Sequence, residues 1–126
     1  MKHSTGKPTI IEAKRMDTIK ELGMCVCCKQ LGMISHYVEV HHLLSGNKRR
    51  GHLYTVGLCQ WHHRGVLYDG IRKQDMITKY GFSLADGSKP FRRMFGSDDY
   101  LLWLQNEMLD AELCPDVESC PVGAVP

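Results

Sequence analysis

Two pairs of side chains have the residue types and spacing of metal ligands. Cys25 and Cys28 are three residues apart, and so are Cys59 and His62. Each such turn can direct two soft ligands at one point, and two turns supply the four ligands that zinc prefers in a closed structural site. The spacing therefore predicts a structural Zn²⁺ that ties the N-terminal part of the chain to its centre.

The remaining cysteines leave alternatives open. In a reducing compartment, thiols are metal ligands or small buried side chains more often than they are disulfides. The four residues could accordingly be buried without a metal, or Cys27 or His52 could replace one of them. No role is assigned from the sequence to Cys114, Cys120 or His36.

Three further histidines, His41, His42 and His63, are not needed for this zinc site. Neighbouring residues of a strand point to opposite faces, so His41 and His42 diverge unless a bend at the strand end directs both into one cleft. A basic run, residues 48–50, follows the pair along the chain. Histidines beside a zinc turn and a basic loop suggest chemistry on a polyanion.

The arrangement resembles the HNH, or ββα-metal, nucleases. Their motif has Asp or His followed by His at the end of one strand, then a second strand and a short helix that carries a final His. Here the matching residues are His41-His42 and the run 58–63 (LCQWHH). Residues 39–65 and 95–109 resemble, more narrowly, the phage recombination-enhancement family Ref, described as RecA-dependent nucleases, and this resemblance covers about residues 24–112.

One position departs from the HNH pattern. The middle Asn of the motif usually lies about five residues before the Cys of the helix, where this chain has Tyr54 and Thr55, and Asn47 lies earlier, in the basic loop. That Asn normally fixes loop geometry, so no catalytic group is lost by the departure.

The resemblance implies a set of roles. His41 and His63 would bind one divalent cation, and His42 would be the general base that activates water for phosphodiester hydrolysis. With only two protein ligands, the cation would keep waters or phosphate oxygens, which suits Mg²⁺ or Mn²⁺. The products would carry 5′ phosphate and 3′ hydroxyl ends.

The charge pattern along the chain is typical of a polyanion-binding face or of an ordinary solvated surface. Residues 1–93 hold all sixteen Lys and Arg against seven Asp and Glu, whereas residues 94–126 hold seven acids and no base. Contacts to DNA phosphates, without base readout, are expected from Lys48, Arg49, Arg50 and Arg64. The acidic end could dock a partner, and the resemblance offers a RecA filament on DNA.

The 126 residues predict one small α+β domain, a zinc-stabilised ββα core with flanking helices. The predicted parts are a lead-in and helix (1–23), the nuclease domain (24–112) and an irregular acidic tail (113–126). In the N-terminal part, a capping box of Thr9 and Glu12 predicts a helix over 10–22 that ends at Gly23. In the centre we expect strands over 37–42 and 53–58, a loop over 45–51 and a short helix after Cys59. After these we expect a helix over 75–80, a turn over 87–90, and a helix after Ser97 with the apolar stripe Tyr100, Leu101, Leu104, Met108 and Ala111.

Other classes are excluded or less favoured. No run approaches the roughly 18–20 apolar residues of a membrane span, and charges are scattered where a signal peptide needs an apolar run, so we expect a cytoplasmic protein without a membrane partner. The rival interpretation is a zinc-stabilised nucleic-acid-binding module without catalysis, in which the three histidines are structural or bind a second zinc. The oligomeric state is not predicted.

Overall fold

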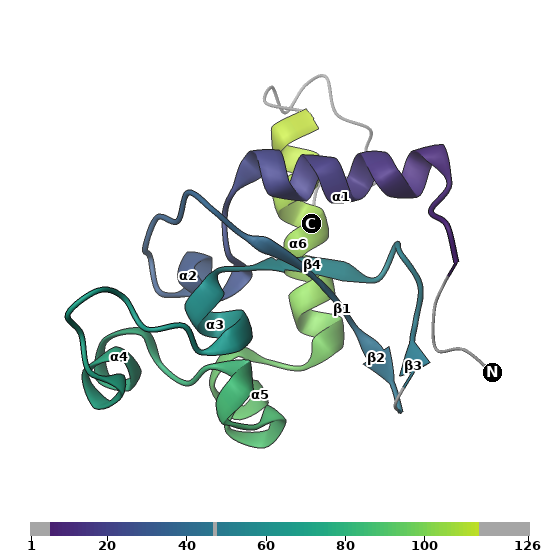
Figure 1. The fold of residues 1–126 in the computed structure, drawn as a ribbon. Coiled ribbons are helices and arrows are strands. Elements are labelled where there is room, and N and C mark those ends of the chain that lie inside the picture. The colour runs from purple at the N-terminus through teal and green to yellow at the C-terminus, as the bar shows by residue number, and fades with distance from the viewer. Residues whose placement is uncertain (1–5, 47, 114–126) are drawn as a thin grey trace.

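The computed structural model describes residues 6–46 and 48–113 and confirms an α+β fold of helices around small antiparallel sheets (Figure 1). The elements follow in the order α1 (Ile10–Leu22), α2 (Val26–Gln30), β1 (Glu39–His42), β2 (Leu44–Ser45), β3 (Lys48–Arg49), β4 (Thr55–Leu58), α3 (Gln60–Arg64), α4 (Lys73–Tyr80), the 3₁₀ turn η1 (Leu84–Asp86), α5 (Ser88–Phe95) and α6 (Asp98–Leu113). None of the helices in the described part of the chain is both long and apolar enough to cross a bilayer.

The first helix begins and ends at the predicted residues. The Thr9 hydroxyl accepts from the Glu12 amide at 3.2 Å, and the Glu12 carboxylate accepts from the Thr9 amide at 2.8 Å, which completes a capping box. Gly23 ends the helix in the left-handed region with φ 68°, which favours glycine. α1 then packs on β1, β4 and α6, and buries Ile19 completely.

The central sheet consists of β1 and β4, paired antiparallel with Glu39 opposite Leu58 and His42 opposite Thr55. β4 is buried along its whole length, with α1 and α6 packed against it, whereas β1 is half-buried (Figure 1). Both strands lie within the predicted ranges but are shorter. The predicted loop over 45–51 is partly wrong, because β2 and β3 pair there as a small exposed hairpin.

Gly57, in the middle of β4, lies where α1 and α6 meet the sheet. Its amide donates to the side-chain oxygen of the buried Gln105 at 2.7 Å. A Cβ at this position would lie 2.9 Å from Ile19 Cγ2 and 3.1 Å from Val38 Cγ2, closer than side chains normally pack. The absence of a side chain at Gly57 therefore allows α1 to approach the sheet.

Gly57→Ala is expected to lower the free energy of unfolding by about 1–3 kcal/mol, because the added methyl overpacks a filled core. Urea unfolding followed by circular dichroism measures the change. Gln74→Ala, an exposed substitution on α4, is the control and should stay within about 0.5 kcal/mol of the parent. A Gly57→Ala protein as stable as the parent would show that the core has room at this point.

The C-terminal half contains one helix that the sequence did not predict. Residues 87–90 were expected to form a turn, but α5 begins at Ser88 and passes through Pro90. Proline is tolerated there because amides of the first helical turn have no partner within the helix. Phe91 and Phe95, four residues apart, are both buried and anchor this helix.

The last helix is capped as predicted, with the Ser97 hydroxyl accepting from the Tyr100 amide at 3.1 Å. Its predicted apolar stripe is partly wrong. Leu101 and Met108 are buried, but Tyr100 is exposed and stacks on Trp103. The irregular tail predicted over 113–126 starts one residue too early, because Leu113 still belongs to α6. The Ala111 side chain and residues 114–126, with Cys114 and Cys120, lie outside the described residues.

Candidate metal centre and histidine cluster

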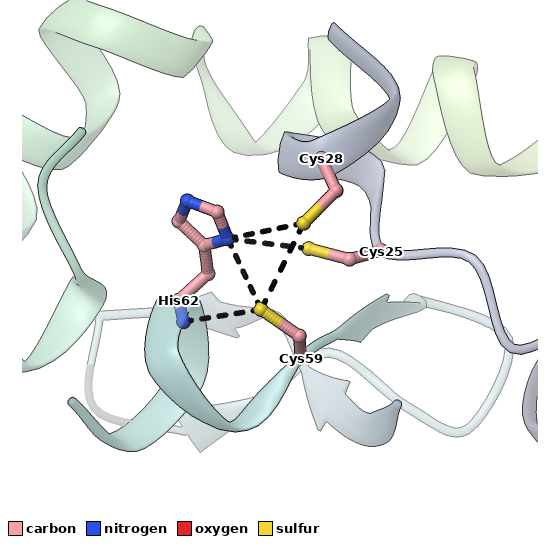
Figure 2. A group of neighbouring side chains, drawn as sticks. All are labelled: Cys25, Cys28, Cys59 and His62. Atoms are coloured by element: carbon pink, nitrogen blue, oxygen red, sulfur yellow. Dashed lines mark hydrogen bonds between the residues drawn. The ribbon is translucent and has the colours of Figure 1, made fainter. Parts of the chain in front are cut away.

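Two helix starts position the four sulfur and nitrogen ligands predicted from the spacing (Figure 2). Cys25 is the N-cap of α2 and Cys28 lies in that helix, while Cys59 is the N-cap of α3 and His62 lies within it. The Cys59 sulfur accepts from the His62 amide at 3.5 Å, which closes the turn. Each CxxC or CxxH turn is therefore a helix start, and the fold places the two starts against each other.

The spacing of the four ligand atoms fits a tetrahedral ion. Bond lengths of about 2.3 Å to sulfur and about 2.05 Å to nitrogen put tetrahedral sulfurs about 3.8 Å apart and sulfur and nitrogen about 3.5 Å apart. In this protein the sulfurs of Cys28 and Cys59 are 3.9 Å apart. The distances from His62 Nδ1 are 3.5 Å to Cys25, 3.7 Å to Cys28 and 3.2 Å to Cys59. This buried Cys₃His cluster could hold a structural zinc ion.

The surroundings of the cluster bear on Cys27 and His52, the two residues that could have replaced one of its ligands. His62 Nε2 donates to the Tyr80 carbonyl at 2.8 Å, which leaves Nδ1 as the nitrogen that faces the sulfurs. Burial, together with its hydrogen bond to Cys25, raises the pKa of the Cys27 thiol, so Cys27 stays protonated as a neighbour of the cluster. His52 lies elsewhere, against His42. Within residues 6–46 and 48–113, this cluster is the one group of three or more ligands close enough to share an ion.

His41 and His63 come together on one side of the sheet. Their rings are 5.1 Å apart in an edge-to-face arrangement, His41 from β1 and His63 from α3. Burial, followed by the neighbouring His63, lowers the pKa of His41 to about 4, so this imidazole is neutral and able to bind a metal at neutral pH. The structure thus joins two of the three histidines that the sequence singled out.

Glu39 orients His63, a role that the sequence analysis missed. His63 Nδ1 donates to Glu39 Oε1 at 2.7 Å, so Nε2 is the nitrogen of His63 that remains for a ligand. Arg64 binds both carboxylate oxygens and holds the pKa of Glu39 below its usual range, so the carboxylate stays charged. Such carboxylate–histidine pairs are a common support of metal ligands. The sequence contains one sign of this role: Glu39 precedes His41 by two residues, so both side chains lie on the same face of the strand.

A cleft of about 540 Å³ opens beside His41. Asp98, the first residue of α6, lines it, and its negative charge acts on His41 to oppose the lowering of that pKa. Arg92 of α5 also lines the cleft and pairs with Asp98 at 3.2 Å. The cleft therefore combines a neutral imidazole with one cation and one anion, neither of which was predicted to belong to the site.

His42 has different partners from His41, as expected for neighbours in a strand. Its Nε2 lies 3.0 Å from Nδ1 of His52, whose Nε2 donates to the Gly6 carbonyl at 2.8 Å. Burial, followed by the positive charge of Arg49 and by His52, lowers the pKa of His42 below its ordinary value. His42 is therefore neutral at physiological pH and has one nitrogen engaged with His52.

The four basic residues of the predicted phosphate surface differ in their partners. Arg50 pairs with Asp99 at 2.9 Å, and Arg64 is held by Glu39. Lys48 and Arg49 form β3 on the exposed hairpin. Lys48, Arg49 and Arg64 are all exposed, but Arg64 is paired with Glu39.

Fold and site together define a small α+β protein in which a buried Cys₃His cluster joins α2 to a strand–strand–helix unit, and this unit also carries a separate group of histidines. A family model described as "Recombination enhancement, RecA-dependent nuclease" matches residues 8–110. The chain belongs to this family, so the resemblance to the RecA-dependent nuclease family inferred from the sequence is confirmed. The family's description indicates a nuclease that acts in recombination together with RecA.

Proposed function

We propose that this protein is a metal-dependent DNA endonuclease of the HNH type that cleaves phosphodiester bonds with low sequence specificity. The observation that carries the proposal is the meeting of His41 and His63 across β1 and α3, in a chain that belongs to a nuclease family. The order β1, β4, α3 agrees with the strand–strand–helix order of that class.

Two imidazoles form the metal site in this proposal. His41 is neutral, and His63 presents Nε2 because Glu39 engages Nδ1, so both can ligate. Two nitrogen donors leave most positions of an octahedral Mg²⁺ or Mn²⁺ ion to water and phosphate oxygens. The bound ion would supply Lewis-acid stabilisation of charge on the scissile phosphate and the leaving oxygen.

His42 is the general base in this proposal. Its pKa lies below the ordinary value, so the imidazole is unprotonated and able to take a proton from water at pH 7. The activated water attacks phosphorus, and the bond to the 3′ oxygen breaks. The products carry 5′ phosphate and 3′ hydroxyl ends.

Plasmid nicking tests the function as a whole. Purified protein with Mg²⁺ should convert supercoiled plasmid or D-loop DNA to nicked product, EDTA should stop it, and a RecA filament should raise the rate. End-labelling of the nicks should report 5′ phosphates. DNA binding with no nicking in Mg²⁺ or Mn²⁺, with or without RecA, would instead favour the non-catalytic zinc-stabilised binding module.

The hairpin cations are proposed to contact DNA phosphates, with Lys48 and Arg49 carrying more of this role than the ion-paired Arg50 and Arg64. The double variant Lys48→Ala/Arg49→Ala should reduce the slope of log K against log salt by about 1.8, because each lost phosphate contact removes about 0.9. Fluorescence anisotropy over a salt series measures this slope.

The matched control removes the same charge from another surface. Lys14→Ala/Lys20→Ala changes two exposed lysines on α1 and should leave the salt slope close to that of the parent. If both double variants lower the slope equally, the hairpin has no special part in DNA binding.

A further inference from the structure

We propose that His52 is a positioning residue that sets the tautomer and the ring orientation of His42. The inference rests on the proposed function, in which His42 is the general base. It assigns the base nitrogen of His42, which the proposed function leaves open: the proton sits on Nε2, and Nδ1 carries the lone pair that accepts a proton from water.

The hydrogen-bond chain fixes where the protons lie. The Gly6 carbonyl can only accept, so His52 Nε2, 2.8 Å away, carries the proton of that imidazole. With its N–H on Nε2, the His52 imidazole offers a lone pair on Nδ1, and His42 Nε2, 3.0 Å from it, donates to this lone pair. A neutral imidazole has one N–H, so Nδ1 of His42 is left unprotonated.

His52 is held rigidly enough to act as an orienting group. Its side chain is 7% exposed, and its ring meets that of His42 edge to face, with centroids 5.2 Å apart. The hydroxyl of Thr55 donates to the His52 carbonyl at 3.0 Å, and Thr55 is the cross-strand partner of His42. The backbone of His52 is thus tied to the residue directly opposite the base.

Arg15 of α1 extends this support. Its guanidinium donates to both the hydroxyl and the carbonyl of Thr55, at 3.0 Å and 2.6 Å, and to Asn106 of α6 at 2.7 Å. The loop that carries His52 is therefore linked through Thr55 to two helices. This arrangement resembles a base oriented by a second group, in which loss of the second group leaves the base present but misplaced.

Steady-state nicking by two His52 variants tests the role. His52→Leu removes the acceptor for His42, whereas His52→Asn retains an amide oxygen near the position of Nδ1. We expect His52→Leu to lower kcat by about 10- to 100-fold and to leave KM and DNA affinity unchanged. This loss is smaller than the whole contribution of a positioned base, which is about 10²- to 10⁴-fold. His52→Asn should recover most of the loss.

Several results would overturn the role. They are wild-type kcat in His52→Leu, an equal loss in both variants, or loss of a bound metal ion from His52→Leu, which would mean that His42 and His52 share a metal. A wild-type protein that does not nick DNA at all would instead refute the proposed function.

A measurement on the unmodified protein keeps the inference testable if His52→Leu does not fold. The ¹⁵N chemical shifts of a histidine distinguish a nitrogen that carries a proton from one with a lone pair. For full-length ¹⁵N-labelled protein at neutral pH, we expect His42 to have a protonated Nε2 and an unprotonated Nδ1. The opposite tautomer would refute the inference whatever the activity of the variants.

Discussion

Replacing His42 by alanine is expected to reduce DNA cleavage by about 10²- to 10⁴-fold, the contribution of a positioned general base. The side chain is half-buried at the end of β1 and is outside the Cys₃His cluster, so the fold and the zinc content should not change. DNA affinity should also be retained, because the loss removes no cation. Single-turnover cleavage of a labelled substrate in Mg²⁺, at saturating protein, measures the chemical step.

The chain offers a matched control for this substitution. His36 is exposed and precedes the sheet, so His36→Ala removes an imidazole of the same size from a position with no part in the proposed mechanism. It should cleave at the parental rate. A further comparison separates base from metal ligand: added imidazole should restore part of the activity of His42→Ala, whereas His63→Ala should respond to a higher Mg²⁺ or Mn²⁺ concentration. Near-parental cleavage by His42→Ala would remove His42 from the mechanism.

What the sequence could predict was local. The capping box of Thr9 and Glu12 and the left-handed stop at Gly23 involve residues within one helix, so the bounds of α1 follow from the sequence alone. The Cys and His pairs are local in the same way, since three-residue spacing at a helix start directs both side chains to one side. The order of strand, strand and short helix also followed from such signals.

What the sequence could not predict depends on strand register and on the path of the chain. Glu39 supports His63 because β1 runs beside α3. The spacing of these two residues in the sequence does not predict that contact. His52 reaches His42 because the β2–β3 hairpin folds back before β4. The sequence shows His52 as an isolated histidine in a loop, which does not predict its contact with His42.

Two errors have a simpler physical cause, the competition between local propensity and packing. The sequence predicts a turn over 87–90, but Pro90 in the first turn of α5 costs no hydrogen bond, and the burial of Phe91 and Phe95 favours the helix. The predicted stripe on α6 is wrong at Tyr100, which is exposed and stacks on Trp103, and it omits Gln105. Gln105 is fully buried, and its side-chain oxygen accepts from the Gly57 amide that faces it.

Cys28→Ser is expected to abolish zinc binding and cooperative folding together. Serine offers a hydroxyl in place of a thiolate, and the other three ligands cannot close a tetrahedral site. Structural zinc supplies an apparent free energy of about 10–16 kcal/mol in small domains, as much as the whole stability of a typical protein. Metal analysis of the purified protein and thermal unfolding by circular dichroism measure the two losses. Chelation of the parent protein should reproduce them.

Cys27→Ala is the control that separates a metal centre from a cluster of buried thiols. Cys27 is as buried as its neighbours, but its thiol stays protonated and hydrogen-bonds to Cys25, so alanine removes only packing and one weak bond. We expect this variant to keep one zinc ion per chain and to lose about 1–2 kcal/mol. If the parent binds no zinc, and Cys27→Ala and Cys28→Ser are destabilised equally, the four residues are a buried core. If only Cys28→Ser unfolds, the metal joins α2 to α3 and thereby holds His63 in position beside His41.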